Sequence, residues 1–168
     1  MLSEKLLEEL NEQIKHEFAS ANYYLAMAAY CKDQNLEGFA NFFIVQAEEE
    51  RFHAMKFFNF IDEMGGKVVI TGYDDPRTTF DSIMDVFAAG LEHEQFVTKR
   101  IHHLMDISME EKNYPAISFL NWFVDEQVEE EATFNDLLEK LKLIDNNTNG
   151  LFMLDKELSS RTFVAPEA

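Results

Sequence analysis

The chain has 168 residues, enough for one domain with a substantial core, and 46% of them are hydrophobic, which excludes a disordered tail or linker. Thirty-two acidic residues against 14 basic ones give a formal net charge of −18. This balance disfavours nucleic acid as a partner, because nucleic acid is held by Lys and Arg side chains that neutralise its phosphates. No apolar run approaches the roughly 20 residues of a membrane helix, and no apolar signal core follows Met1. The single cysteine, Cys31, excludes both an internal disulfide and a thiolate metal site, so we expect a reducing, cytoplasmic setting without a membrane partner.

The spacing of the apolar residues predicts four long helices and one short helix. Sixteen Phe with only 6 Gly and 3 Pro leave few helix breakers. Ser3 is a candidate N-cap for the first helix, and Pro115 suits the first turn of the fourth. The connection over residues 67–76 is too long for a tight turn and indicates a crossover along a bundle. The expected helices span about residues 4–32, 36–64, 79–112, 115–144 and 151–160, which together predict an all-α four-helix bundle with one long crossover connection and a short fifth, C-terminal helix.

Each long helix carries an apolar stripe that polar side chains interrupt. The interruptions are Glu17 in the first helix, Glu50 and His53 in the second, Glu94 in the third, and Gln127 and Glu130 in the fourth. A rise of about 1.5 Å per residue places all of them roughly 20 Å along their helices, near the middle of the bundle. Buried carboxylates repel one another, and each costs several kcal/mol to desolvate. Protonation relieves part of that cost, but a bound metal relieves it more completely, so we interpret the cluster as a metal site.

The residue types indicate which metal the site holds. Glu50 and His53 form the only Glu-x-x-His of the chain, and their spacing puts both side chains on one helical face. Carboxylate oxygens with one imidazole are typical of iron or manganese, whereas a zinc site usually offers more His or Cys. Several carboxylates can serve two metals with one of them bridging. Hard oxygen donors also favour iron(III) over iron(II), which helps O2 to take electrons.

These residues belong to a larger ordered set of motifs, through which the chain resembles the bacterial type of non-haem ferritin over essentially its whole length. The set comprises Asn-Glu-Gln at 11–13 before Glu17, Glu-Glu-Glu-Arg-Phe-His at 48–53, Glu-His-Glu-Gln at 92–95, Phe-Leu-Asn-Trp-Phe-Val-Asp-Glu-Gln-Val-Glu-Glu-Glu at 119–131, and the tail at 150–158. One Glu-x-x-His alone would be a weak signal, but the ordered set is highly specific. The resemblance implies a ferritin-like fold.

By this resemblance, Glu17, Glu50 and His53 would hold a first iron, and Glu50, Glu94 and Glu130 a second, with Glu50 bridging. Gln127 stands where a protein with two Glu-x-x-His motifs would carry an acid. The implied function is a ferroxidase that oxidises two iron(II) ions per subunit with O2 or hydrogen peroxide. The family stores the iron(III) mineral inside a hollow homo-oligomer of 24 subunits.

The resemblance also implies a third iron site, formed by Glu49, Glu126 and Glu129 on the side of the cage interior. The alternative is a solvated acidic face, since Glu is mostly exposed in proteins. Tyr24 lies seven residues after Glu17 and faces the same way. It could supply an electron or hydrogen-bond a ligand, and we expect the second, because buried Tyr hydroxyls usually find a partner.

Three observations argue against related functions. Arg51 stands where the haem-ligating Met of bacterioferritin would be, so we expect no haem. Rubrerythrin-type peroxidases normally carry a four-cysteine module, which Cys31 alone cannot build, and mini-ferritins form their sites between subunits. A di-iron oxidase or peroxidase acting in oxidative-stress protection stays open as the alternative, whereas a purely structural bundle would leave the buried acids unexplained.

The remaining histidines and the aromatic residues have simpler interpretations. His16 and His93 flank site residues in sequence but point about 100° away, so we expect surface or interface roles for them. His102 and His103 receive no function. Trp122 and the Phe-rich stripes are expected to be core or subunit contacts.

Overall fold

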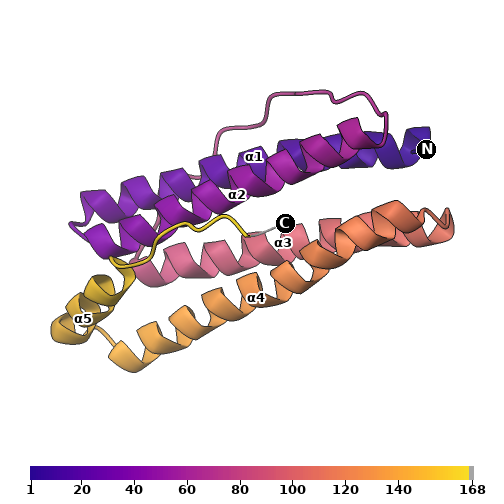
Figure 1. The fold of residues 1–168 in the computed structure, drawn as a ribbon. Helices are drawn as coiled ribbons and strands as arrows, with labels where there is room; N and C mark the ends of the chain where they lie inside the picture. The colour runs from indigo at the N-terminus through magenta and orange to yellow at the C-terminus, as the bar shows by residue number, and fades with distance from the viewer. Residues whose placement is uncertain (167–168) are drawn as a thin grey trace.

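A computed structural model describes residues 1–166 of the chain. Within them every regular element is a helix: α1 (Glu4–Asp33), α2 (Glu37–Glu63), α3 (Ile83–Glu110), α4 (Tyr114–Ile144) and α5 (Thr148–Leu158). Figure 1 shows α1 and α2 as one antiparallel pair, α3 and α4 as a second pair beneath it, and α5 across one end. The predicted all-α bundle with a short fifth helix is confirmed. No helix among the described residues combines the length and hydropathy needed to cross a membrane.

Local capping explains where the helices begin and end. The Ser3 hydroxyl accepts a hydrogen bond from Leu6 N at 3.0 Å, as predicted for the start of α1. Asn113 caps α4 in the same manner, and Pro115 lies in its first turn. Gly65 follows α2 with a φ of 73°, a left-handed conformation that favours glycine and stops the helix.

The predicted start of the third helix at about residue 79 was wrong, because α3 begins at Ile83. The reason is Ser82, whose hydroxyl caps the helix by accepting from Asp85 N at 3.1 Å. Arg77 holds the preceding residues outside the helix by donating to the Thr79 carbonyl at 2.8 Å and to Asp85 at 2.5 Å. The fifth helix begins at Thr148 rather than 151 because Asn147 caps it, and the other predicted bounds are within two residues.

The connection between α2 and α3 runs along the bundle beside α1, as predicted (Figure 1). Asn11 fixes its first part: the side-chain amide donates to the Lys67 carbonyl at 3.0 Å and accepts from Val69 N at 2.7 Å. The crossover makes α3 start at the end of the bundle where α1 finishes.

The core consists of two apolar clusters separated by a polar middle. One contains Phe43, Phe87 and Phe134, and the other contains Phe57 and Phe123. The six polar side chains that interrupt the predicted stripes are all buried. The polar interruptions of those stripes therefore lie inside the bundle, between the two clusters.

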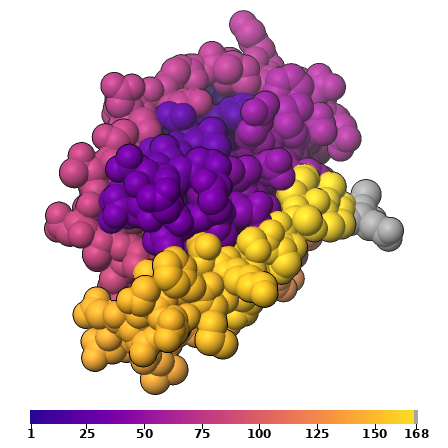
Figure 2. All heavy atoms as spheres, turned by 90° about the vertical axis from the view of Figure 1, so that its left-hand side faces the viewer, coloured from indigo at the N-terminus to yellow at the C-terminus, as the bar shows by residue number. Residues whose placement is uncertain are grey.

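Helix α5 closes the end of the bundle against α2, and Figure 2 shows this end with α5 in yellow. Asp155 accepts a hydrogen bond from Phe39 N at 3.0 Å and so caps α2, whose own N-cap residue, Leu36, provides no side-chain cap. A Cβ at Gly38 would lie 1.6 Å from the Asp155 carbonyl oxygen, so this close contact requires glycine.

Candidate metal centre

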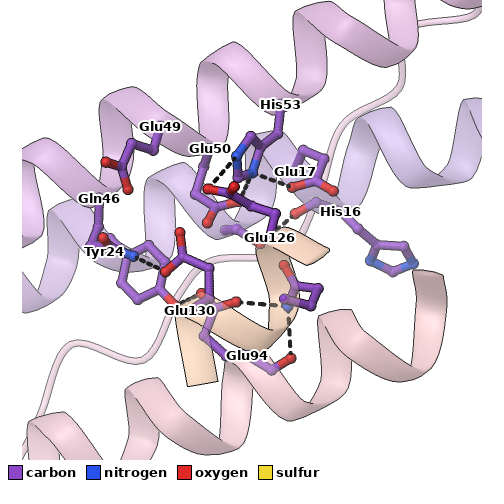
Figure 3. Close-up of polar contacts among 12 residues, drawn as sticks. His16, Glu17, Tyr24, Gln46, Glu49, Glu50, His53, Glu94, Glu126 and Glu130 are labelled. Atoms are coloured by element: carbon purple, nitrogen blue, oxygen red, sulfur yellow. Dashed lines mark hydrogen bonds and ion pairs between the residues drawn. The ribbon is translucent and has the colours of Figure 1, made fainter. Parts of the chain in front are cut away.

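Three ligand side chains meet in the middle of the bundle. Glu17 comes from α1, and Glu50 and His53 come from consecutive turns of α2 (Figure 3). One ligand atom from each residue lies within 4.8 Å of the other two, and all three side chains are buried. His53 Nδ1 is 3.7 Å from Glu17 Oε2 and 3.6 Å from Glu50 Oε2. The three donors can therefore surround one cation.

The same two carboxylate oxygens have no hydrogen-bond partner. Glu17 Oε2 and Glu50 Oε2 are both buried away from solvent, and neither accepts a hydrogen bond. Buried acceptors are almost always satisfied, and an unpaired buried charge is strongly destabilising. A metal ion would satisfy both oxygens at once, so the donor set fits iron or another hard cation.

Glu94 and Glu130 approach the same centre from α3 and α4 (Figure 3). Gln127 donates to Glu94 Oε2 at 3.1 Å and to the Glu94 carbonyl at 3.2 Å, and the Tyr24 hydroxyl donates to Glu94 Oε1. Glu130 Oε2 accepts from Gln46 Nε2 at 2.9 Å. Glu94 and Glu130 are thus two further acids that point towards Glu17, Glu50 and His53 (Figure 3). Unlike the free oxygens of that group, their carboxylates accept hydrogen bonds.

Three of the four acids of the centre, Glu50, Glu94 and Glu130, have raised pKa values. Burial, with the neighbouring charge of Glu94, raises the pKa of Glu50 well above its usual range. Burial and the nearby carboxylates raise the pKa of Glu94 to about 7 and that of Glu130 to about 8. The centre without a cation is therefore partly neutralised by protons, which a metal ion would displace.

His53 and Glu17 behave as an ion pair within this centre. Burial lowers the pKa of His53, but the attraction of the Glu17 and Glu50 carboxylates, 3.7 and 3.6 Å from Nδ1, outweighs that effect, so the net direction is well above the usual value. Burial raises the pKa of Glu17, yet the attraction of His53 and the hydrogen bond from Gln13 outweigh burial and lower it overall. A metal ion bound by His53 would take the place of a proton on the imidazole.

Tyr24 is fully buried, and its hydroxyl contacts Glu94, which agrees with the expected hydrogen bond to a ligand. Its ring stacks on Phe43 and Phe134 with centroid distances of 6.0 and 5.8 Å. Burial and the charge of Glu94 raise the pKa of Tyr24 well above its usual value. The phenol therefore stays protonated and directs its O–H at the acid.

The three acids predicted for a further metal site lie beside this centre. Glu126 Oε1 is 3.9 Å from His53 Nε2, whereas Glu129 is exposed. Burial, with the charges of Glu129 and Glu49, raises the pKa of Glu126, which indicates that the three carboxylates are near neighbours. Glu49 is paired with Arg161 at 3.0 Å. The three acids are therefore neighbours, but one already has a cationic partner.

The other histidines lie outside the centre. His93 is only partly buried: its Nε2 is 2.7 Å from Ser20 Oγ, and its ring stacks on Tyr23 at 4.7 Å. Burial lowers the pKa of His93 to about 4, so the ring is neutral. His16 packs edge-on against Phe96 at 5.2 Å. Neither residue belongs to the ligand group.

Sequence reasoning missed two buried glutamines that contact the acids. Gln13 Nε2 donates to Glu17 Oε1 at 2.8 Å, and Gln46 donates to Glu130. Both glutamines are 0% exposed. The signal for Gln13 was its position four residues before Glu17, and for Gln46 its place in an apolar stripe. No sequence pattern pointed to Arg161, which arrives from beyond α5.

Residues 7–144 match the family model described as a ferritin-like domain. The chain belongs to the ferritin-like family. Curated relatives of this ferritin-like chain include the bacterial non-heme ferritins of Staphylococcus saprophyticus and Staphylococcus aureus strain MRSA252. Each is 48% identical over 163 residues, which cover 97% of this chain and 98% of the relative.

Solved structures show the same fold as this ferritin-like chain. A form of the Archaeoglobus fulgidus ferritin that was engineered to be closed is 47% identical, with a TM-score of 0.96 over 98% of this chain and 100% of that one. The open-pore ferritin of the same hyperthermophilic archaeon has a TM-score of 0.95 at 47% identity, over 96% of this chain and 100% of that one.

Proposed function

We propose that this ferritin-like chain stores iron. Two iron(II) ions bind per subunit in the middle of the bundle, O2 oxidises them there, and the iron(III) product collects inside a cage of 24 identical copies. The observation that supports this most strongly is the pair of buried, unpartnered oxygens on Glu17 and Glu50, which face His53. Membership of the ferritin-like family agrees with it.

The proposed roles follow from the donor set. Glu17, Glu50 and His53 hold the first iron, and Glu50 bridges to a second iron held by Glu94 and Glu130. Protons leave these acids as the ions bind, since each cation takes over the charge that a proton had neutralised.

The reaction is a ferroxidation. Each iron(II) loses one electron, and one O2 takes both electrons with two protons to give hydrogen peroxide. Hydrogen peroxide can serve as the oxidant instead. The hard carboxylate oxygens contribute by stabilising iron(III) more than iron(II).

Five further residues complete the proposed site. Gln127 and Tyr24 orient Glu94 through the hydrogen bonds that they donate to it. Glu49, Glu126 and Glu129 form a weaker third iron site on the way to the cage interior. The net charge of −18 suits this function, because inward carboxylates attract iron and nucleate mineral.

The proposal includes a cytoplasmic setting and a protein without haem. Arg51, where a haem-ligating Met would stand in bacterioferritin, is an exposed residue of α2. An absorption spectrum of the purified protein tests this directly. A Soret band of stoichiometric intensity would contradict it.

The decisive experiment is aerobic iron loading followed by size-exclusion chromatography with iron analysis. A large shell that elutes together with many irons per subunit supports storage. A protein that turns over iron or peroxide but retains only about two irons per subunit would instead be a di-iron oxidase or peroxidase.

The variant Glu50→Ala tests the site, because Glu50 is the proposed bridge. We expect it to abolish rapid iron oxidation while the shell still assembles. Glu48→Ala, which changes an exposed acid on the same helix, is the matched control and should oxidise iron normally. Wild-type oxidation kinetics in Glu50→Ala would show that the site is misassigned.

A further inference from the structure

The chain that follows α5 returns along α2 towards the middle of the bundle (Figure 1). Asn41 of α2 fixes its start, because the side-chain amide donates to the carbonyls of Leu158 at 3.0 Å and Arg161 at 2.9 Å. Further on, the Phe163 ring lies 6.1 Å from the ring of Phe52. These contacts bring Arg161 to the side of the metal centre.

The guanidinium of Arg161 is held by three residues on one face of α2. Its Nη2 donates to Gln46 Oε1 at 2.5 Å and to the two carboxylate oxygens of Glu49 at 3.2 and 3.0 Å. The guanidinium carbon lies 4.5 Å from the centre of the Phe42 ring, in a cation–π contact. Arg161 therefore has a defined position, although its side chain is partly exposed.

This contact decides how the Gln46 amide is turned. An amide oxygen only accepts hydrogen bonds, an amide NH2 group only donates, and a guanidinium only donates. Because Arg161 donates to the amide oxygen of Gln46, the NH2 group of this amide must face Glu130, to which it donates at 2.9 Å. With the amide reversed, oxygen would face oxygen at Glu130, and donors would face donors at Arg161.

The same arrangement recurs on the other side of the centre. Arg100 of α3 donates to Gln13 Oε1 at 3.4 Å, and Gln13 Nε2 donates to Glu17 Oε1 at 2.8 Å. Arg100 is itself anchored by Glu9 at 2.8 Å. Two acids of the centre, from different helices, thus each accept a hydrogen bond from a buried glutamine. The amide oxygen of each glutamine in turn accepts a hydrogen bond from an arginine.

We propose that Arg161 and Arg100 are positioning residues of the metal centre, each fixing the amide of a buried glutamine so that its NH2 group orients a ligand carboxylate. The inference rests on the proposed function, because it takes Glu130 and Glu17 to be metal ligands. The glutamine donates to one oxygen of the acid, so it leaves the other oxygen available to the metal. Such outer contacts commonly change metal affinity about 10- to 100-fold.

The test measures binding of Zn²⁺, which cannot be oxidised, to the assembled full-length protein by titration calorimetry. Arg161→Met removes the guanidinium, Arg161→Lys keeps a positive donor, and Gln46→Leu removes the amide. We expect Arg161→Met and Gln46→Leu each to weaken binding at the centre by about 10-fold, and Arg161→Lys to restore most of the affinity. In the Gln46→Leu background, Arg161→Met should have no further effect.

A purely electrostatic role for Arg161 predicts the opposite change in Zn²⁺ affinity. If Arg161 acted only by repelling cations, Arg161→Met would bind Zn²⁺ more tightly, and that result would overturn the proposal. An unchanged affinity, or an equal loss in the Gln46→Leu background, would overturn it as well. Arg51→Gln, which removes a positive charge from an exposed position of α2, the helix that carries Gln46, is the matched control and should not alter binding.

A second pair of variants keeps the proposal testable if Arg161→Met does not assemble. Arg100→Met and Gln13→Leu should also weaken binding without adding to each other, and additive losses would contradict the proposal. Circular dichroism and gel filtration establish that each variant is folded and assembled. Absence of Zn²⁺ binding in the wild-type protein would refute the metal site itself, which distinguishes a failure of the proposed function from a failure of this inference.

Discussion

The hydroxyl of Tyr24 donates to Glu94 Oε1 across the middle of the bundle and so joins α1 to α3 through a buried acid. Gln127 of α4 donates to the other oxygen of the same carboxylate at 3.1 Å. Both oxygens of Glu94 thus have donors, while Glu17 and Glu50 each keep one without a partner. The metal centre therefore has carboxylate oxygens without hydrogen-bond donors on the side of α1 and α2, whereas both oxygens of Glu94, on α3, already have donors.

The Tyr24 contact predicts the effect of Tyr24→Phe. Loss of the hydroxyl leaves one Glu94 oxygen without its donor. The Zn²⁺ affinity should therefore fall by about 5-fold, which corresponds to the usual net free energy of one hydrogen bond. Tyr23→Phe, in the neighbouring ring that stacks on His93, is the control and should bind normally. A variant with normal Zn²⁺ affinity but slow iron oxidation would mean that Tyr24 supplies an electron rather than a hydrogen bond.

The raised pKa values predict how the metal-free protein responds to pH. The pKa values of Glu94 and Glu130, about 7 and about 8, are higher than the ordinary value of 4.5. Between pH 4.5 and these values, the folded state therefore binds more protons than the unfolded chain. Their contribution to stability is therefore present at low pH and is lost as the pH rises through about 8. Urea unfolding at about pH 6 and about pH 9 should show this loss, and a Glu94→Gln, Glu130→Gln variant should show less of it. Equal pH dependence in the two proteins would refute the assignment.

Metal binding should release the same protons. Calorimetric titration with Zn²⁺ in buffers of different ionisation enthalpy measures the number released, which should be larger at about pH 6 than at about pH 9. A release that does not depend on pH would show that the acids are ionised before the metal arrives.

Gly90 allows the ring of Phe134 to lie close to α3. A Cβ at Gly90 would lie 2.3 Å from that ring, and Phe134 in turn stacks on Tyr24. Gly90→Ala should therefore destabilise the subunit by about 1–3 kcal/mol, as overpacking does, and should lower the melting temperature. Gly72→Ala is the control, since a Cβ there meets nothing within 4 Å. An unchanged melting temperature in Gly90→Ala would show that the ring can move freely.

The third iron site makes a separate prediction. A variant with Glu49, Glu126 and Glu129 all changed to Gln should keep two tight metal sites per subunit and lose a weaker third one. Glu92→Gln, an exposed acid of α3, serves as the control. Retention of three metal ions in the triple variant would mean that these acids form only a solvated face.

The sequence was sufficient for the fold and for the burial of the main ligand candidates because both depend on helical periodicity. Glu17, Glu50, His53, Glu94 and Glu130 interrupt apolar stripes, and burial follows from that position alone. The start of α3 was misplaced because the Ser82 cap, with Arg77 holding the residues before it, outweighs the periodicity of the four preceding residues. Arg161 could not be predicted, since nothing in a periodic pattern tells where a segment beyond the last helix will lie.

We propose that the acids of four helices share bound iron in the middle of one subunit. Crystals soaked anaerobically with a ferrous salt, examined by anomalous scattering at the iron edge, test it most directly. We predict two iron peaks, one among Glu17, Glu50 and His53 and one between Glu50, Glu94 and Glu130. An empty centre in crystals that bind iron elsewhere would show that these acids are not iron ligands.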